Sequence, residues 1–216
     1  MEKVVLRIER DDSPESPREW GNLGTFLTWQ RRYNSPDKND YSDPRSCMES
    51  LAYDYTDRNT YDMTDKQIQR IVEKHYIILP VYVYEHSSIA FSVHSFSDPW
   101  DSGQAGFIYV SKEDARKEYG VKRLTAKVRA KVEKVLESEV EVYGQWVNGD
   151  VWGFVLEDDK GDTIDACWGF YGSDPRENGM DGHIEEKYHF LFDKLDEVGG
   201  GYEAKSWDED EEEDED

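Results

Sequence analysis

The chain has 216 residues, and its 49 acidic residues outnumber its 26 basic residues to give a formal net charge of −23. Such a charge repels nucleic acids and anionic membranes and attracts basic surfaces, and no apolar run approaches the length of a membrane-spanning helix. A hydrophobic content of 37%, with seven Trp, fourteen Tyr and eight Phe, excludes a disordered chain and indicates a folded core.

The acidity is concentrated in the last nine residues, 208–216, which are all Asp or Glu, but it does not end there. Residues 1–207 still hold 40 acids against 26 bases, a net charge of −14. A run of like charges must stay solvated, so it either solubilises the chain, repels other anions or imitates a nucleic-acid backbone. Ordinary solubility and adaptation to high salt are the alternatives to a functional acidic surface.

The first predicted element is a strand over residues 3–9, where Val4, Leu6 and Ile8 alternate with polar residues. An acidic loop follows up to Pro17. Residues 34–62 are rich in Asp, Ser, Asn and Tyr and predict a long loop with a short helix over 47–53.

Regular structure resumes with a helix over 64–75, because Thr64 and Gln67 form a capping-box pattern ahead of apolar residues at helical spacing. The β-branched and aromatic run 77–84 predicts a strand, in which Pro80 indicates an edge position or a bulge. Residues 88–93 should pair with it as a hairpin, and a further strand is expected over 107–110.

Two helices are expected next, over 111–120 and from Thr125 to about residue 142. Strands over 151–157 and 163–170 flank a turn and should form a hairpin. The apolar spacing in 184–198 predicts a last helix, which Gly199–Gly201 would end.

Strands that come in hairpins, with helices in separate blocks, predict an α+β fold with an antiparallel sheet and three or four helices packed on it. We expect one domain over residues 1–198, followed by a flexible glycine hinge and acidic tail over 199–216. The two cysteines, Cys47 and Cys167, are far apart, which predicts buried free thiols in a reducing, cytoplasmic setting.

The loop between the strands at 88–93 and 107–110 holds one candidate site. It places polar groups beside an aromatic side chain, which favours a ligand pocket in a small enzyme or binding protein: His94, Asp98, Trp100, Asp101, Ser102 and Gln104. The alternative is a hairpin loop shaped by Pro99, Gly103 and Gly106. We predict no catalytic residue, metal site or cofactor.

A second candidate is an acidic partner-binding surface in which Tyr alternates with Asp. Carboxylates spaced along a surface can imitate phosphates, and tyrosines supply rigid contact area. The residues concerned are Asp54, Asp57, Asp62 and Asp65, with Asp208, Glu209, Asp210 and Glu211 of the tail.

A third candidate is basic. Residues 112–134 hold nine bases and four acids, and four of the bases recur at three- or four-residue steps on one helix face: Arg123, Lys127, Lys131 and Lys134. Such a face could bind nucleic acid or the acidic tail of the chain, and the alternative is an ordinary solvated helix face. Direct nucleic-acid binding is otherwise not expected of so acidic a chain.

Three segments resemble uncharacterised proteins encoded by phages, plasmids and related mobile elements. They are Pro14–Thr25 with Arg31–Tyr33, the Trp100–Gln104 loop with Ile108–Val110, and Cys167–Gly172. The first motif of that group has Asp where this chain has Gly21, which puts any role of that Asp in doubt here.

The resemblance implies a mobile-element protein in the cytoplasm of a prokaryotic cell and carries over no activity. In that setting small acidic proteins often antagonise restriction or CRISPR systems, which is an association and no mechanism. The leading hypothesis is thus a non-enzymatic, DNA-mimic-like antagonist whose acidic surface binds the basic groove of a host defence enzyme. The sequence leaves the partner and the oligomeric state open.

Overall fold

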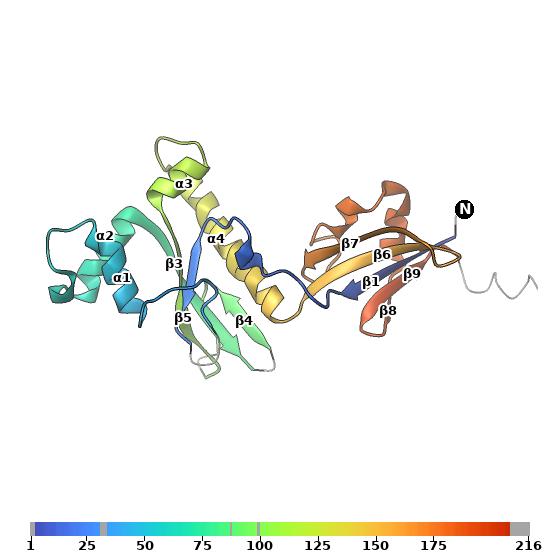
Figure 1. The fold of residues 1–216 in the computed structure, drawn as a ribbon, viewed down its shortest axis with the longest axis horizontal. Helices are drawn as coiled ribbons and strands as arrows, with labels where there is room; N and C mark the ends of the chain where they lie inside the picture. Colours follow the sequence, from blue (N-terminus) through green and yellow to red (C-terminus); the bar gives the residue numbers. More distant parts are fainter. Residues whose placement is uncertain (1–2, 31–33, 87, 99, 208–216) are drawn as a thin grey trace, which may run out of the picture. The chain divides into compact units, whose positions relative to one another are not determined.

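A computed structural model of the chain describes residues 3–30, 34–86, 88–98 and 100–207. It confirms the predicted α+β class and contains two antiparallel sheets (Figure 1). Where the sequence led us to expect one domain, the chain divides into two compact units. The terminal unit combines Met1–Glu15 with Gln145–Asp216, and the central unit is Ser16–Gly144.

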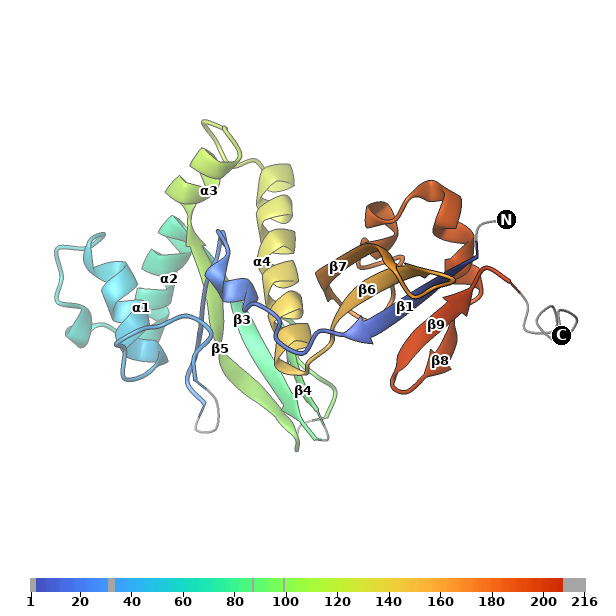
Figure 2. The ribbon, with the colours of Figure 1, turned by 45° about the vertical axis from the view of Figure 1, so that its right-hand side comes forward.

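The terminal unit is built on a five-stranded sheet whose order is β7-β6-β1-β9-β8, so the two ends of the sequence pair in the middle of it (Figure 2). Leu6, Ile8 and Phe154 on one sheet face pack with Met180 and Leu191 from two 3₁₀ helices. The elements are β1 (Val4–Arg10), β6 (Val151–Asp158), β7 (Thr163–Tyr171), η3 (Met180–His183), η4 (Glu186–Asp193), β8 (Asp196–Val198) and β9 (Gly201–Lys205).

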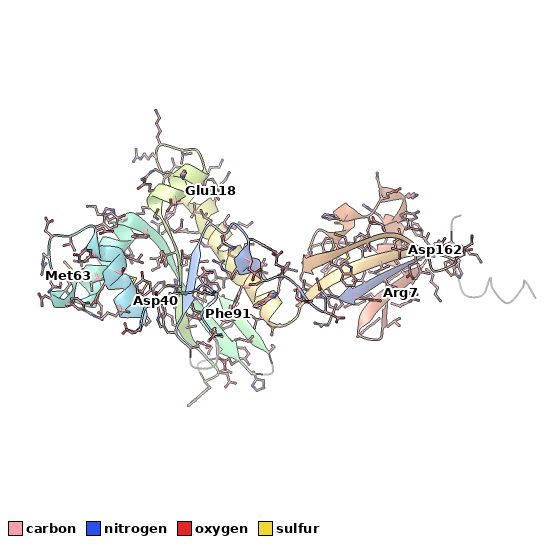
Figure 3. The ribbon with its side chains drawn as sticks, in the orientation of Figure 1. Arg7, Asp40, Met63, Phe91, Glu118 and Asp162 are labelled. Atoms are coloured by element: carbon pink, nitrogen blue, oxygen red, sulfur yellow. The ribbon has the colours of Figure 1, made fainter. Side chains whose placement is uncertain are left out.

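Arg7 on β1 ties the neighbouring strands together on the opposite side of the pleat from this core (Figure 3). Its guanidinium lies 2.6 Å from a carboxylate oxygen of Glu157 on β6 and 3.2 Å from one of Glu203 on β9. Cross-strand pairs of opposite charge stabilise a sheet, so the three strands are joined by side chains as well as by the backbone.

The prediction of a helix over 184–198 is wrong at its C-terminal end, and so is the prediction that Gly199–Gly201 begins a flexible segment. The helical part is the 3₁₀ turn η4, after which β8 and β9 form a hairpin with Val198 opposite Gly201. Gly199 and Gly200 both have positive φ, which a two-residue hairpin turn demands. The glycines are therefore a strand turn, and order continues through β9, where Ala204 is buried opposite Leu6.

The central unit has three layers, with α4 on one face of its sheet and α1 and α2 on the other (Figure 1). The sheet order is β2-β5-β3-β4. The elements are η1 (Pro17–Glu19), β2 (Thr25–Thr28), α1 (Pro44–Tyr53), η2 (Thr60–Asp62), α2 (Asp65–His75), β3 (Tyr76–Glu85), β4 (Ile89–Ser92), β5 (Ser102–Ser111), α3 (Lys112–Glu118) and α4 (Ala126–Val147).

Side chains of β2 and β5 pack on both faces of this sheet. Phe26 packs edge-on against Phe91 and Tyr143 on the α4 side, with ring centroids 6.0 and 5.4 Å away. Leu27 and Phe107 instead join buried Cys47 of α1 on the other side. A strand buried on both faces reads as a continuous apolar run, which is why its sequence shows no clean alternation.

The helices α2, α3 and α4 begin within one residue of the predicted position, whereas α1 begins at Pro44, three residues before the predicted start at 47. At the start of α2 the backbone N–H of Thr64 donates a hydrogen bond to Gln67 Oε1 at 2.9 Å, as the capping-box pattern requires. Ser111 Oγ accepts a hydrogen bond from the backbone N–H of Asp114 at the start of α3. Within the described ranges, no helix is both long and apolar enough to cross a bilayer.

Pro80 lies on β3 at the point where β4 no longer pairs with it. The β3–β4 ladder covers Tyr82–Glu85 only, and Pro80 faces Phe107 on β5. A register shift follows between Val81 and Tyr82. The missing N–H of proline thus falls beside an unpaired edge and a bulge, as predicted.

The two thiols are free but differ in burial, which gives a testable difference in reactivity. Cys47 is buried, and burial raises its pKa to about 12, whereas Cys167 is partly exposed. Because the thiolate is the nucleophile, we expect iodoacetamide at pH 8 to modify Cys167 and to spare Cys47 in the folded chain. Mass spectrometry would check this, and urea should make both thiols reactive. Rapid modification of Cys47 in the folded chain would contradict the structure.

Candidate functional site

The negative charge is distributed unequally between the two units. The terminal unit has 29 acids and 8 bases, a net charge of −21, while the central unit has 20 acids and 18 bases, a net charge of −2. The nine acids of 208–216 account for less than half of the charge of the terminal unit. In the central unit, acids and bases instead gather on different elements, and this segregation marks its candidate surfaces.

The first surface is the Tyr/Asp segment, residues 53–65, which runs from the end of α1 through η2 to the start of α2. Tyr53 and Tyr61 are 70% and 80% exposed, although large aromatic side chains usually bury most of their area. Asp54 and Asp57 lie between them and Asp62 follows Tyr61; all three are exposed and form no ion pair with any described residue. The structure therefore places these predicted residues together on the surface.

Asp65, the fourth predicted aspartate, has a different position. Its carboxylate pairs with Arg45, whose other nitrogens lie 2.8 Å from Glu49 Oε1 and 2.9 Å from the Met63 carbonyl oxygen. Its charge is thus locally compensated. Asp208, Glu209, Asp210 and Glu211 lie outside the described residues.

A groove of about 620 Å³ lies next to the Tyr/Asp segment, between the α1–α2 pair and the sheet. Its floor is apolar and its rim polar. Glu73 on the rim accepts a hydrogen bond from Gln69 at 2.7 Å, and its charge interacts with that of Lys112. The lining residues are Pro44, Arg45, Met48, Asp65, Ile68, Gln69, Glu73, Ile78, Pro80, Gln104 and Phe107.

The predicted ligand loop is shorter than expected, because Ser102 and Gln104 lie on β5, where they pair with β3. Its polar side chains do not gather around one cavity. Trp100 is 91% exposed, and His94 lies 3.3 Å from Glu137 of α4. Asp101 instead faces His86 at 3.2 Å. Of this set, Gln104 lines the groove.

The remaining polar groups of that loop bond locally. Asp98 Oδ1 accepts the backbone N–H of Trp100 at 2.8 Å, and Ser102 Oγ donates to the Asp98 carbonyl oxygen. These are the contacts of a connecting loop held by its own side chains. The alternative interpretation as a hairpin loop is nevertheless wrong, because β4 and β5 each pair with β3 and lie on opposite sides of it.

Of the four residues of the predicted basic helix face, Lys127, Lys131 and Lys134 lie on α4, whereas Arg123 lies before the helix begins. Val132, Leu136 and Val140 of α4 are buried against the sheet. The opposite face exposes Lys127, Lys131 and Lys134, and Arg123 is exposed in the bend before α4.

A buried charge cluster that we did not predict lies beneath η1. Arg18 has a 5% exposed side chain between Asp37 and Glu139. It donates to both Asp37 oxygens, at 2.9 and 2.7 Å, to Glu139 at 3.0 Å and to the Gly24 carbonyl oxygen at 2.7 Å. Burial would lower the pKa of Arg18, but the hydrogen bonds and charges of Asp37 and Glu139 outweigh it and raise the pKa.

The two carboxylates are also satisfied by the backbone. Glu139 accepts the N–H groups of Leu23 and Gly24, at 2.8 and 3.2 Å, and Asp37 accepts that of Phe26 at 2.6 Å. A cluster with its donors and acceptors used internally holds the chain in place and offers little to a ligand. It gives the Pro14–Thr25 motif a structural role.

One signal in the sequence pointed to this cluster. Glu139 lies within the apolar face of α4, next to Val140 and three residues after Leu136. A carboxylate at such a position requires a buried partner. The sequence could not identify Arg18 as that partner, because 121 residues separate the two.

Across the described ranges, no group of three or more His, Cys, Asp or Glu side chains is arranged to hold a metal ion. Comparison with family models, with curated proteins and with solved structures found no match to this chain.

Proposed function

We propose that the chain is a non-enzymatic binding protein that docks on a basic surface of another protein through its Tyr/Asp segment. The observation that carries this proposal is the exposure of Tyr53 and Tyr61 beside Asp54, Asp57 and Asp62, which lack ion pairs within the described chain. Tyrosine is enriched at interfaces because it offers large, rigid area with a polar tip. Uncompensated carboxylates attract a cationic partner and speed its association.

The adjoining groove supports the same proposal. An interface gains most of its affinity from a few side chains buried in pockets, surrounded by a polar rim. Here Met48, Ile78 and Phe107 supply an apolar floor next to the acidic segment, and Glu73 adds a rim carboxylate. A partner with basic and apolar side chains in one segment fits both features.

The proposed partner class is a nucleic-acid enzyme, because such enzymes present basic grooves that carboxylates in place of phosphates can occupy. The resemblance to phage and plasmid proteins narrows this to an antagonist of a host defence enzyme, of the anti-restriction or anti-CRISPR kind. That narrower proposal rests on the resemblance alone.

The proposal predicts that Asp54→Asn/Asp57→Asn/Asp62→Asn weakens partner binding about tenfold, since each exposed charge contributes roughly 0.2–1 kcal/mol. Tyr61→Ala should cost about 1–2 kcal/mol of binding free energy if Tyr61 is an anchor. Partners captured from a bacterial lysate at low salt by the unmodified chain should be depleted with either variant. Affinity measured on the purified partner should fall as salt rises.

The control is Asp159→Asn/Glu177→Gln/Glu197→Gln, which removes the same charge from exposed positions of the terminal unit. It should retain the captured partners. Equal loss with both triple variants would show that net charge alone drives binding, and unchanged capture with the aspartate variant would reject the Tyr/Asp segment as the docking site.

A further inference from the structure

The basic helix face, defined as Lys127, Lys131 and Lys134 of α4 together with Arg123 just before the helix, is unusual in a chain where acids outnumber bases by 49 to 26. All four side chains are exposed, and none is paired with a carboxylate of the described residues. Pairing was available on the same helix, where Arg129 lies 2.7 Å from Glu133 four residues later. The four cations therefore keep their full charge available to a partner.

Other cations gather on α3 and on a different side of α4, since Arg129 lies about 160° around the helix from Lys127 and Lys131. Lys112 donates to the carbonyl oxygens of Glu73 and Lys74 at the end of α2, at 2.7 and 3.0 Å. Burial and the charges of Arg129 and Arg116 lower the pKa of Lys112, and the charge of Glu73 opposes this lowering. Residues 112–134 carry a net charge of +5 from nine bases and four acids, within a unit that is nearly neutral.

We propose that the basic helix face binds the phosphate backbone of duplex nucleic acid without reading its sequence. Lys127 and Lys134 lie about 10 Å apart along the helix axis at 1.5 Å per residue, and duplex DNA offers one phosphate charge per about 1.7 Å of its axis. Lysine is a point charge suited to phosphate, and residues 123–134 contain no Asn or Gln to read adenine. This inference does not depend on the proposed function, because the Tyr/Asp segment lies on other elements.

The test is fluorescence anisotropy of a labelled 20-base-pair duplex with the full chain between 50 and 200 mM salt. If four phosphates are neutralised, the logarithm of the binding constant should fall against that of salt with a slope of about −3.6. Lys127→Gln/Lys131→Gln should make that slope shallower by about 1.8 and weaken binding equally for unrelated sequences.

The matched control is Lys66→Gln/Arg70→Gln, which removes two exposed cations at the same four-residue spacing from α2. It should leave the slope unchanged. Equal effects of the two double variants, or no salt-dependent binding at 50 mM salt by either the full chain or a chain lacking Asp208–Asp216, would overturn the proposal. Binding that appears only in the shortened chain would support it, because removal of nine carboxylates lowers the repulsion of the duplex.

A labelled peptide with the sequence of residues 208–216 tests whether the basic helix face instead binds an acidic protein segment. If the peptide binds in a manner that requires Lys127 and Lys131 while the duplex binds neither form of the chain, the face recognises an acidic protein segment and the nucleic-acid proposal fails.

Discussion

Arg18→Met should destabilise the central unit by about 3–5 kcal/mol, a large part of the 5–15 kcal/mol that holds an ordinary domain folded. The substitution leaves Asp37 and Glu139 largely buried without the cation between them. It also removes the hydrogen bond to the Gly24 carbonyl oxygen that fixes the chain before β2. Urea unfolding followed by circular dichroism would measure the loss, and faster amide exchange in β2 and β5 would locate it.

Two further variants test the physical reason. Arg18→Lys should cost less than Arg18→Met, because it retains the charge but loses the planar fork that bonds both oxygens of Asp37. Adding Glu139→Gln to Arg18→Met should cost less than the sum of the two single effects, since it removes a carboxylate that has lost its cation. Arg58→Met, at an exposed position, should change stability by less than about 0.5 kcal/mol. A similar loss from Arg18→Met and Arg58→Met would contradict the cluster's role.

Local signals predicted much of this fold because their causes lie within a few residues. The capping box at Thr64 and the serine cap at Ser111 are where we predicted them, and the hairpin of β6 and β7 follows its turn. The error at 184–198 arose because three glycines end a helix as readily as they turn a hairpin. The pairing of β9 with β1 decides in favour of the hairpin turn, and it joins residues about two hundred positions apart.

The candidate surfaces were also predictable only as far as their causes lie close together in the sequence. Exposure of the Tyr/Asp segment and of the basic helix face follows from local composition and helical spacing. The groove, the Arg18 cluster and the division into two units depend on contacts distant in sequence, which spacing does not encode. The segment 94–104 shows that composition alone does not predict a ligand site, because the same residue types occur in ligand pockets and in self-bonded turns.

Two of the segments that the sequence singled out, Pro14–Thr25 and Cys167–Gly172, contain closely packed positions in this fold. A Cβ on Gly24 would lie 2.5 Å from the Leu136 side chain and 2.8 Å from that of Ile108, so a larger residue would have to displace these two side chains. Gly153 on β6 similarly leaves room for the Trp168 ring of β7. Motifs of this kind specify the fold and leave recognition to the exposed surfaces between them.

Gly106→Ala should destabilise the central unit by about 3 kcal/mol or more, because β5 has no space for a side chain at this position. Gly106 lies opposite Thr28 on β2, and its added Cβ would overlap the Leu27 carbonyl oxygen and approach the Thr28 Cα to 2.8 Å. Both are backbone atoms, so β2 would have to move away from β5 and weaken the ladder between them. Urea unfolding would give the magnitude, and amide exchange in β2 should rise more than in β4.

Gly103→Ala is the matched control, on the same strand and in the same motif. A Cβ there meets nothing within 4 Å, so the change should alter stability by less than about 1 kcal/mol, and it could stabilise by restricting the unfolded chain. If the two alanine variants were equally stable, the close approach of β2 and β5 at Gly106 would be wrong. If Gly103→Ala alone reduced binding of a partner at unchanged stability, the open end of β5 would join the docking surface beside Gln104 and the groove.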